Sequence, residues 1–174
     1  MERGWLIHVV PRIGKIPDAQ WLEVGSYEGR SALWAVDHML HGPKACVTCV
    51  DIWDANMPGL PSWGDVNYEA HFDTNTRGNN RILKLKGKAE DILPTLKGKM
   101  FHGAYLDSSH TEESVLIEAR LIWDLLLPGA VFVFDDYGSP QHPGVKKSAD
   151  AFLKQPNIGH TILHRAWQLI LIKI

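Results

Sequence analysis

Three aspartates and one histidine stand out in the stretch "AYLDSSHTEESVLIEARLIWDLLLPGAVFVFDDYG". Asp107 follows one apolar run, His110 lies three residues later, and Asp135 and Asp136 follow a second apolar run. Charged residues at the ends of apolar segments are unusual unless a ligand requires them. Carboxylate oxygens suit a hard divalent cation, and an imidazole accepts protons near neutral pH. Solvated loop acids and a histidine that packs the start of a helix are the structural alternatives.

A second candidate site lies in "WLEVGSYEGRS", where Gly25 and Gly29 stand between an apolar run and a helical pattern. Glycines let a backbone approach a ligand, and a helix N-terminus offers free N–H groups. The spacing is not the dinucleotide fingerprint, and Glu23 disfavours a pyrophosphate. Asp51, 22 residues beyond Gly29, stands where an acid commonly binds ribose hydroxyls. The pattern fits a nucleoside with a cationic tail and no phosphates; a tight strand-to-helix turn is the alternative.

The elements that must position these residues alternate along the chain. Apolar and β-branched runs predict strands at 20–24, 45–53, 81–87, 102–107, 130–136, 160–166 and 167–174. Helical periodicity and capping residues predict helices at 30–40, 66–76, 89–98, 111–127 and 144–155. This order predicts an α/β fold, a doubly wound parallel sheet with helices on both faces. Ligands bind such sheets at the carboxyl ends of the strands, which is where the candidate acids fall.

At these residues the chain resembles the class I S-adenosylmethionine-dependent methyltransferases, over about 21–174. "EVGSYEGRS" is similar to the family's first motif, "VDIWD" to its second, "GKAEDILPTL" to the segment beside adenine and "LLLPGAVFVFDD" to the post-core strand. The resemblance implies a Rossmann-like seven-stranded sheet whose last strand is antiparallel. It also implies a cofactor site made of Glu23, Gly25, Ser26, Tyr27, Gly29, Ser31, Asp51, Ile52, Trp53, Ala89, Glu90 and Asp107. Within it, Glu23 and Gly25 face the methionine end, Asp51 the ribose, Trp53 or Ile52 the adenine face, and Ala89 and Glu90 its edge. Ser26 and Tyr27 depart from the family pattern, because many members carry a glycine there.

The acids after the later strands resemble those of the metal-dependent O-methyltransferases of the catechol and the sugar or antibiotic type. This resemblance implies that Asp107, Asp135 and Asp136 hold Mg²⁺ or another divalent cation, which would ease deprotonation of a substrate hydroxyl. It also implies that His110 is the general base, as in the sugar-type relatives. The expected activity is methyl transfer to a hydroxyl of a small molecule: a sugar, a polyol or a phenol. A metal-independent N- or O-methyltransferase and a non-catalytic nucleotide-binding module of the same fold are the alternatives.

The walls of the acceptor site are less clearly marked in the sequence. Trp63 and Tyr68 are candidate wall residues, and the Pro- and Gly-rich loop 54–65 is expected to be a lid, with a packing role as its alternative. For His142, a plain loop histidine is favoured over a substrate contact. About 20 residues precede the first predicted strand, so the resemblance predicts an open site without large covering helices.

Length and charge limit the remaining function classes. The 174 residues predict one domain, 1–174, and a net charge of -2 without a basic stripe does not suggest a nucleic-acid partner. The apolar runs are too short for a bilayer and no signal peptide is visible, so a cytoplasmic protein is expected, and a homo-oligomer is left open. Cys46 and Cys49 lie in a predicted strand with side chains on opposite faces, which favours buried, inert thiols over a redox pair.

Overall fold

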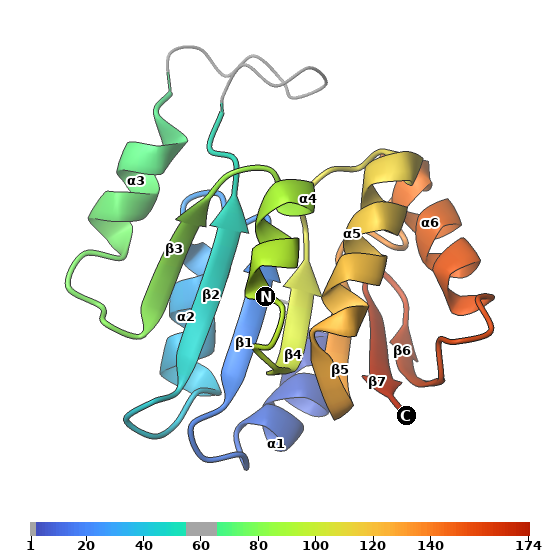
Figure 1. The fold of residues 1–174 in the computed structure, drawn as a ribbon, viewed down its shortest axis with the longest axis horizontal. Coiled ribbons are helices and arrows are strands. Elements are labelled where there is room, and N and C mark those ends of the chain that lie inside the picture. The colour runs from blue at the N-terminus through green and yellow to red at the C-terminus, as the bar shows by residue number, and fades with distance from the viewer. Residues whose placement is uncertain (1–2, 55–65) are drawn as a thin grey trace.

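Seven strands form one sheet in the computed structural model, which describes residues 3–54 and 66–174 (Figure 1). The strand order is β3-β2-β1-β4-β5-β7-β6. β3, β2, β1, β4 and β5 are parallel, and β7 runs antiparallel to β5 and β6. The strands are β1 Gln20–Val24, β2 Cys46–Asp51, β3 Ile82–Lys86, β4 Phe101–Leu106, β5 Leu126–Phe134, β6 His160–Arg165 and β7 Leu169–Lys173. The predicted seven-stranded sheet with an antiparallel last strand is therefore confirmed.

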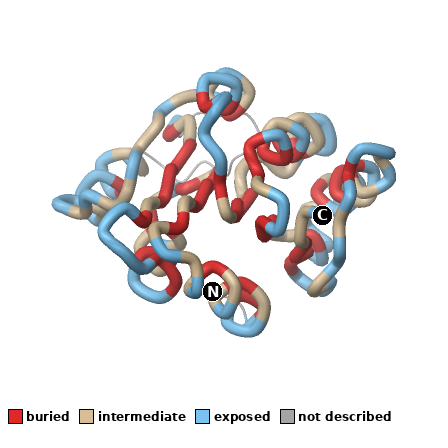
Figure 2. Tube along the Cα trace, turned by 60° about the horizontal axis from the view of Figure 1, so that its bottom comes forward, coloured by how far each residue is buried: buried red, intermediate tan, exposed pale blue. Residues whose placement is uncertain are grey.

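Helices cover both faces of the sheet (Figure 1). The segments α4 Ala89–Ile92, η2 Leu93–Leu96, α5 Glu112–Asp124 and α6 Pro143–Leu153 lie over one face, and their apolar side chains share a core with β1, β4 and β5. The segments η1 Trp5–Val9, α1 Val10–Ile13, α2 Arg30–His38 and α3 Tyr68–Asn75 contribute to a second core on the other face. Figure 2 shows the result as buried strands inside a shell of partly exposed helices. Two buried faces explain why β5 is a continuous apolar run.

An N-terminal helical segment, which the sequence pattern does not predict, braces the middle of the sheet. η1 and α1 bury Trp5, Val9 and Ile13 completely or almost so. The ring of Trp5 meets that of Tyr105 edge-to-face at 5.0 Å, and Tyr105 lies near the carboxyl end of β4. This contact fixes the ring of a residue whose hydroxyl reaches the candidate acids.

The helix predicted over 111–127 ends earlier than its apolar pattern indicates. α5 stops at Asp124, β5 already begins at Leu126, and Pro128-Gly129 lies inside that strand instead of terminating the helix. β5 accommodates the pair through an irregular register: Leu126 pairs with Phe101, and pairing then resumes at Val131 with Gly103. Gly129 adopts a left-handed conformation with φ 82°, which only glycine adopts without strain.

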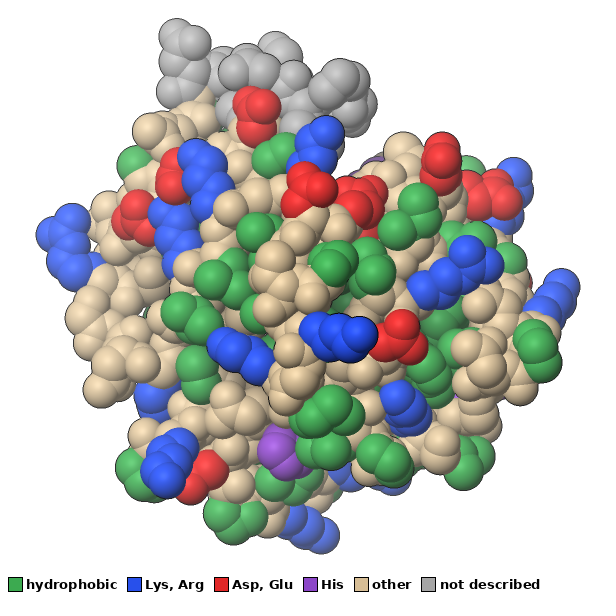
Figure 3. All heavy atoms as spheres, viewed as in Figure 1, with side chains coloured by type: hydrophobic (Ala, Val, Ile, Leu, Met, Phe, Trp, Pro, Cys, Tyr) green, Lys and Arg blue, Asp and Glu red, His purple; other side chains and the backbone are tan. Residues whose placement is uncertain are grey.

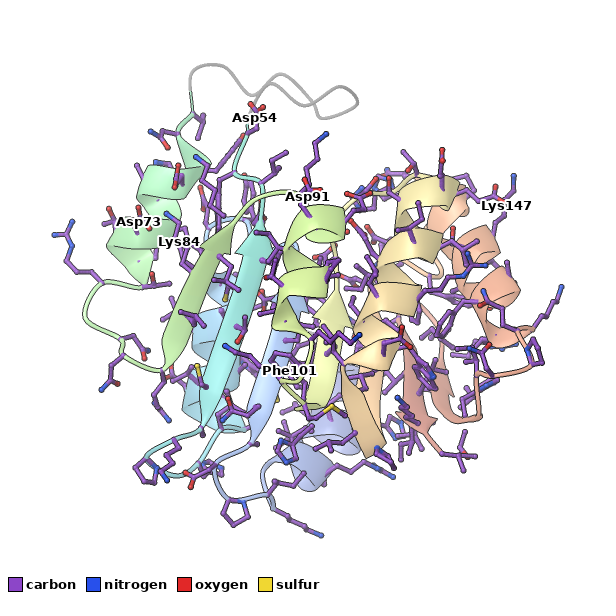
Figure 4. The ribbon with its side chains drawn as sticks, viewed as in Figure 1. Asp54, Asp73, Lys84, Asp91, Phe101 and Lys147 are labelled. Carbon is purple, nitrogen blue, oxygen red and sulfur yellow. The ribbon has the colours of Figure 1, made fainter. Side chains whose placement is uncertain are left out.

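Ion pairs fasten α3 to the edge strand β3. Lys84 Nζ lies 2.8 Å from Glu69 Oε1 and 2.6 Å from Asp73 Oδ1, and Lys86 Nζ lies 2.5 Å from Glu69 Oε2. Figure 4 shows Asp73 on α3 and Lys84 on β3 close together. The edge strand and its helix thus form one unit beside the end of β2.

The surface charges are mixed on one face, and the cysteines can be compared with the sequence expectation. Lys and Arg are interspersed with Asp and Glu on the face shown in Figure 3. Both cysteines are free thiols whose pKa is raised by burial, but Cys46 is only half-buried, because the end of its strand is partly open, whereas complete burial was expected. None of the helices within 3–54 and 66–174 has the length and apolar content needed to cross a membrane.

Candidate active site

The carboxyl ends of β1 and β4 meet where the strand order reverses, the usual ligand-binding crevice of such sheets. Gly25 leaves β1 with φ 87°, and its N–H donates to Val50 O at 2.9 Å. A Cβ atom on residue 25 would lie 1.9 Å from the carbonyl oxygen of Asp107. The left-handed turn and the main chain just after β4 therefore both require this glycine, which supports the tight-turn alternative; the approach of a ligand remains a prediction.

Asp51 organises the loop between β1 and α2. Its Oδ2 accepts hydrogen bonds from the N–H groups of Ser26 and Tyr27, both at 2.8 Å, and its Oδ1 accepts one from Trp53 N at 2.7 Å. Tyr27 and Trp53 both have left-handed backbones, with φ 47° and 45°. The carboxylate thus holds a conformation at Tyr27 that glycine usually supplies, which explains how a tyrosine can occupy this position. A ribose contact of Asp51 remains a prediction.

Glu23 is fully buried beneath this loop. Its Oε1 accepts a hydrogen bond from Ser31 Oγ at 3.0 Å, whereas its Oε2 has no partner. Burial raises the pKa of Glu23 to about 8. The hydroxyl of Ser26 is also buried without a partner. Unpaired buried oxygens beside the loop fit a ligand that brings N–H groups or positive charge, such as the methionine end of S-adenosylmethionine.

Helix α3 supports the same loop from outside. Glu28 Oε1 lies 2.6 Å from His71 Nδ1, and Glu28 O accepts a hydrogen bond from Asn75 Nδ2 at 2.9 Å. Tyr68, a predicted wall residue for the acceptor, places its ring 4.6 Å from that of Tyr27 and has a buried hydroxyl without a partner. Tyr68 thus packs on the loop between β1 and α2. The other predicted wall residue, Trp63, and the predicted lid, apart from Asp54, lie outside the described residues.

The predicted adenine site is only partly open. Trp53 is 8% exposed; its ring packs 4.7 Å from that of Phe72, and Lys84 Nζ lies 5.0 Å above it. The core contacts therefore leave little of this ring for adenine. Ile52 is half-buried, and the pair Ala89 and Glu90 begins α4 beside the end of β2. Figure 4 shows Asp54 and Asp91 at this carboxyl edge and Phe101 toward the amino end of β4.

One phenol hydroxyl links two of the predicted metal ligands. Tyr105 Oη lies 3.0 Å from Asp107 Oδ2 and 2.6 Å from Asp135 Oδ2, so its single proton is shared between two carboxylates. Asp135 Oδ1 accepts a second hydrogen bond from Gln168 Nε2 at 2.8 Å. Burial and the neighbouring Asp135 charge raise the pKa of Asp107 to about 7. Both oxygens of Asp135 are thus engaged in hydrogen bonds. The other oxygen of Asp107, Oδ1, lies on the side of His110 and Asp136.

Asp136 faces two histidines. His110 Nε2 lies 3.2 Å from Asp136 Oδ2 and 4.0 Å from Asp107 Oδ1, and His142 Nε2 lies 3.7 Å from Asp136 Oδ2. The two imidazole rings stack with centroids 3.8 Å apart. Within the described ranges, the ligand atoms of His110, Asp136 and His142 come within 4.8 Å of one another, a spacing that a metal ion could bridge. His142 was expected to be a plain loop histidine, and only the folded 136–142 turn brings it here.

Burial keeps His110 in its neutral form. The pKa of His110 is lowered by burial and by the neighbouring His142, while the charge of Asp136 opposes this shift. His110 Nε2 is buried and no group meets it in hydrogen-bonding geometry. An uncharged ring with an unpaired nitrogen between two carboxylates is suited to accept a proton and to have the resulting cation stabilised.

A pocket of about 290 Å³ joins the two halves of the site. Residues 25–28, 30 and 31 line one side, and Tyr105, Asp107, Asp135, Trp167 and Gln168 line the other. The loop predicted to bind the cofactor therefore shares one cavity with Asp107 and Asp135, whereas Asp136, His110 and His142 lie outside its lining. Tyr105, Trp167 and Gln168 carry no motif in the sequence; only the alternation of side chains along β4 indicates that Tyr105 faces away from Leu106.

Comparison with known proteins agrees with this fold. A family model described as a methyltransferase domain matches residues 22–137. Rhamnosyl O-methyltransferase from Mycobacterium leprae (strain TN) is 31% identical over 123 residues, which are 70% of this chain and 50% of that protein. The chain thus spans about half the length of this relative.

Solved structures share the architecture at low sequence identity. The O-methyltransferase TomG from Streptomyces achromogenes, involved in tomaymycin synthesis and solved with S-adenosylmethionine, superimposes with a TM-score of 0.69 at 19% identity, over 99% of this chain and 80% of its own. The TDP-rhamnose 3'-O-methyltransferase CalS11 of calicheamicin biosynthesis superimposes with a TM-score of 0.65 at 17% identity, over 93% and 74% of the two chains. At these identities the likeness shows the fold alone.

Proposed function

Because this chain belongs to the methyltransferase domain family, we propose that it is an S-adenosylmethionine-dependent O-methyltransferase acting on a hydroxyl of a small molecule, of the sugar or natural-product type. The observation that carries the proposal is the single pocket that joins the β1–α2 loop to Asp107 and Asp135. The rhamnosyl O-methyltransferase relative supports a sugar hydroxyl as acceptor.

The residues of the β1–α2 loop suit the methyl donor. S-adenosylmethionine supplies an electrophilic methyl group on a positively charged sulfur. Glu23 and Asp51 place carboxylates beneath and beside the loop, and the unpaired Glu23 Oε2 offers an acceptor to the donor's ammonium group. A phosphate group placed beside the loop would be repelled by the like charge of the Asp51 carboxylate. Asp51 would keep the loop closed around the nucleoside.

His110 would act as the general base. As the acceptor oxygen bonds to the methyl carbon, the carbon–sulfur bond breaks and its electron pair remains on sulfur, leaving S-adenosylhomocysteine. The hydroxyl proton passes to His110 Nε2, the nitrogen that has no hydrogen-bond partner. Asp136 Oδ2, at 3.2 Å, would stabilise the imidazolium, and the ring stacked on it would keep His110 in place.

A divalent cation is part of this proposal, with Asp107 and Asp136 as the first candidates to hold it. The ligand atoms that lie within 4.8 Å of one another in the described residues belong to His110, Asp136 and His142. Asp107 Oδ1 and Asp136 Oδ2 both lie near His110 Nε2, whereas Asp135 is already engaged by Tyr105 and Gln168. Each carboxylate oxygen has a second lone pair, so Asp135 remains a proposed ligand as well. Such a cation would lower the pKa of the acceptor hydroxyl, and the all-oxygen set of three aspartates favours Mg²⁺.

Methyl transfer can be tested directly with purified protein. We would incubate it with S-adenosylmethionine and methyl α-L-rhamnoside, with magnesium or with a chelator, and follow S-adenosylhomocysteine and the methylated sugar by mass spectrometry. The proposal predicts magnesium-dependent formation of both products in equal amounts. Failure to bind S-adenosylmethionine in calorimetry would contradict the function itself, whereas equal rates with magnesium and chelator would contradict only the metal.

A further inference from the structure

The turn between β6 and β7 places a large aromatic side chain at the mouth of the pocket. Trp167 is 45% exposed and lines the cavity together with Asp107 and Asp135. Most of the other tryptophans in the described residues are packed: Trp5 and Trp21 are fully buried, and Trp123 is 4% exposed. An indole left nearly half open beside polar side chains is a feature of ligand sites more than of cores.

The backbone of this turn is firmly attached to the loop that carries Asp136. Gly138 N donates to Trp167 O at 2.9 Å, and Ala166 N donates to Gln168 O at 3.0 Å. A Cβ atom on Gly138 would lie 2.5 Å from Ala166 O, so the two segments touch backbone to backbone. The next residue, Gln168, is buried and donates to Asp135 Oδ1. The indole is therefore presented from a fixed turn whose neighbour orients an acid of the site.

The chemistry of this end of the pocket indicates which acceptor suits it. On the side of the acids, the lining combines one open indole with hydrogen-bonding groups: the Tyr105 hydroxyl and the carboxylates of Asp107 and Asp135. The other open aromatic ring of the pocket, Tyr27, belongs to the β1–α2 loop. A pyranose ring has an apolar C–H face and a rim of hydroxyls, and it matches one aromatic surface surrounded by polar groups. A phenol ring is apolar on both faces and would require an apolar wall on each side.

We propose that Trp167 is an acceptor-binding residue, on whose indole the apolar face of a sugar ring lies while its reacting hydroxyl points toward Asp107. This inference rests on the proposed function and extends it to a residue and to a ring type. Trp167 takes no part in methyl transfer itself, so it should determine acceptor affinity rather than the rate of the chemical step.

Fluorine NMR of protein labelled with 5-fluorotryptophan tests the contact without relying on turnover. The resonance of Trp167 is assigned as the one missing from the Trp167→Phe variant, and methyl α-L-rhamnoside or catechol is added in the presence of S-adenosylhomocysteine. We expect the rhamnoside to shift this resonance and catechol to shift it less. A shift with catechol alone, or none with the rhamnoside, overturns the proposal.

Kinetics with the same sugar provide the second measurement. Trp167→Ala should raise KM for the rhamnoside about 10-fold, the order expected for one aromatic contact, with kcat nearly unchanged. Trp167→Phe should recover most of this loss. Ile162→Ala, at a 39% exposed position of β6, is the matched control and should leave KM unchanged. Parental KM in Trp167→Ala, with S-adenosylmethionine binding and rhamnoside methylation intact, would overturn the role of Trp167 while leaving the proposed function standing.

Discussion

Gly25 and Asp107 touch backbone to backbone: a Cβ atom on residue 25 would lie 1.9 Å from the carbonyl oxygen of Asp107. This contact joins the loop that would hold the methyl donor to the strand end that would meet the acceptor. A displacement of either backbone must displace the other, because neither can yield through a side chain. The distance between donor and acceptor sites is thus set by main-chain packing.

The loss of stability on replacing a glycine by alanine should therefore depend on which atoms surround that glycine. Gly25→Ala should prevent folding or destabilise it by several kcal/mol, since the new atom meets backbone. Gly78→Ala, also left-handed with φ 78° but in open space, should cost only about 1 kcal/mol, the conformational cost of that backbone. Urea denaturation followed by circular dichroism measures both. Equal losses at the two positions would show that the Asp107 contact does not limit residue 25.

Asp51→Ala should loosen the β1–α2 loop and weaken S-adenosylmethionine binding at least about 10-fold. The variant loses a carboxylate that accepts three backbone N–H bonds, and each bond to a charged group contributes about 1.5–3 kcal/mol. Calorimetric titration gives the affinity. Asp37→Ala, at an exposed position of α2, removes the same charge as a control and should bind the donor like the parent.

His110→Ala should reduce turnover by about 10²–10⁴-fold, as is typical for loss of a positioned general base. The affinity for S-adenosylmethionine should hardly change, since the residues proposed to bind it belong to β1, β2 and the β1–α2 loop. The pKa of His110 is lowered by burial, so the rising limb of the parental pH–rate profile should lie below the ordinary histidine range and be absent from the variant. The exposed His38→Ala on α2 serves as control. Near-parental turnover with an unchanged profile would remove His110 from the mechanism.

Stability should fall as the pH rises from about 4.5 to about 7, in part because of Glu118. This side chain is buried in α5, where it accepts a hydrogen bond from Ser108 Oγ, and burial raises its pKa from 4.5 to about 7. The folded chain thus retains a proton that the unfolded chain has lost, so the stabilisation is complete below pH 4.5 and disappears as the pH passes 7. Over this window the loss amounts to about 3 kcal/mol.

Denaturation curves at pH 5 and pH 8 measure this effect. Glu118→Gln should flatten the pH dependence, because the amide stays neutral and can still accept the hydrogen bond from Ser108. Glu113→Gln, exposed on the same helix, should keep the parental dependence. A Glu118→Gln protein with the parental slope would assign the pH dependence to other groups, with Glu23 the next to test.

The sequence was sufficient for the sheet and for the strand ends that carry the acids. Alternating apolar runs predict parallel strands, and parallel strands bring Glu23, Asp51 and Asp107 to one edge regardless of loop detail. The left-handed backbone at Tyr27 could not be predicted, because the Asp51 bond that supports it comes from the end of the neighbouring strand β2, 24 residues away in the sequence. For Gly25, the left-handed turn with φ 87° fits the glycine in the sequence, but the close contact with Asp107 after β4 could not be predicted.

Residues outside the motifs escaped prediction where tertiary contacts define their role. His142 stacks on His110 only because the 136–142 turn folds back, with His142 N donating to Ser139 O and Ser139 N to Asp136 O. Trp167 reaches the pocket because β7 returns antiparallel next to β5. Neither contact produces a motif or a residue spacing that could be recognised in the sequence. The end of α5 at Asp124 could not be predicted either, because the leucines that follow it are compatible with both a helix and a strand.

The ion pairs that fasten α3 to β3 have a consequence for assembly. An edge strand exposes unpaired backbone groups to which a strand of another molecule can add, and natural sheets often prevent this with lysines. A chain adding to β3 would have to approach past Lys84 and Lys86, which already hold Glu69 and Asp73 of the adjoining helix. These ion pairs between β3 and α3 should therefore disfavour aggregation by strand addition at β3. Any association between copies of the chain should use a different surface.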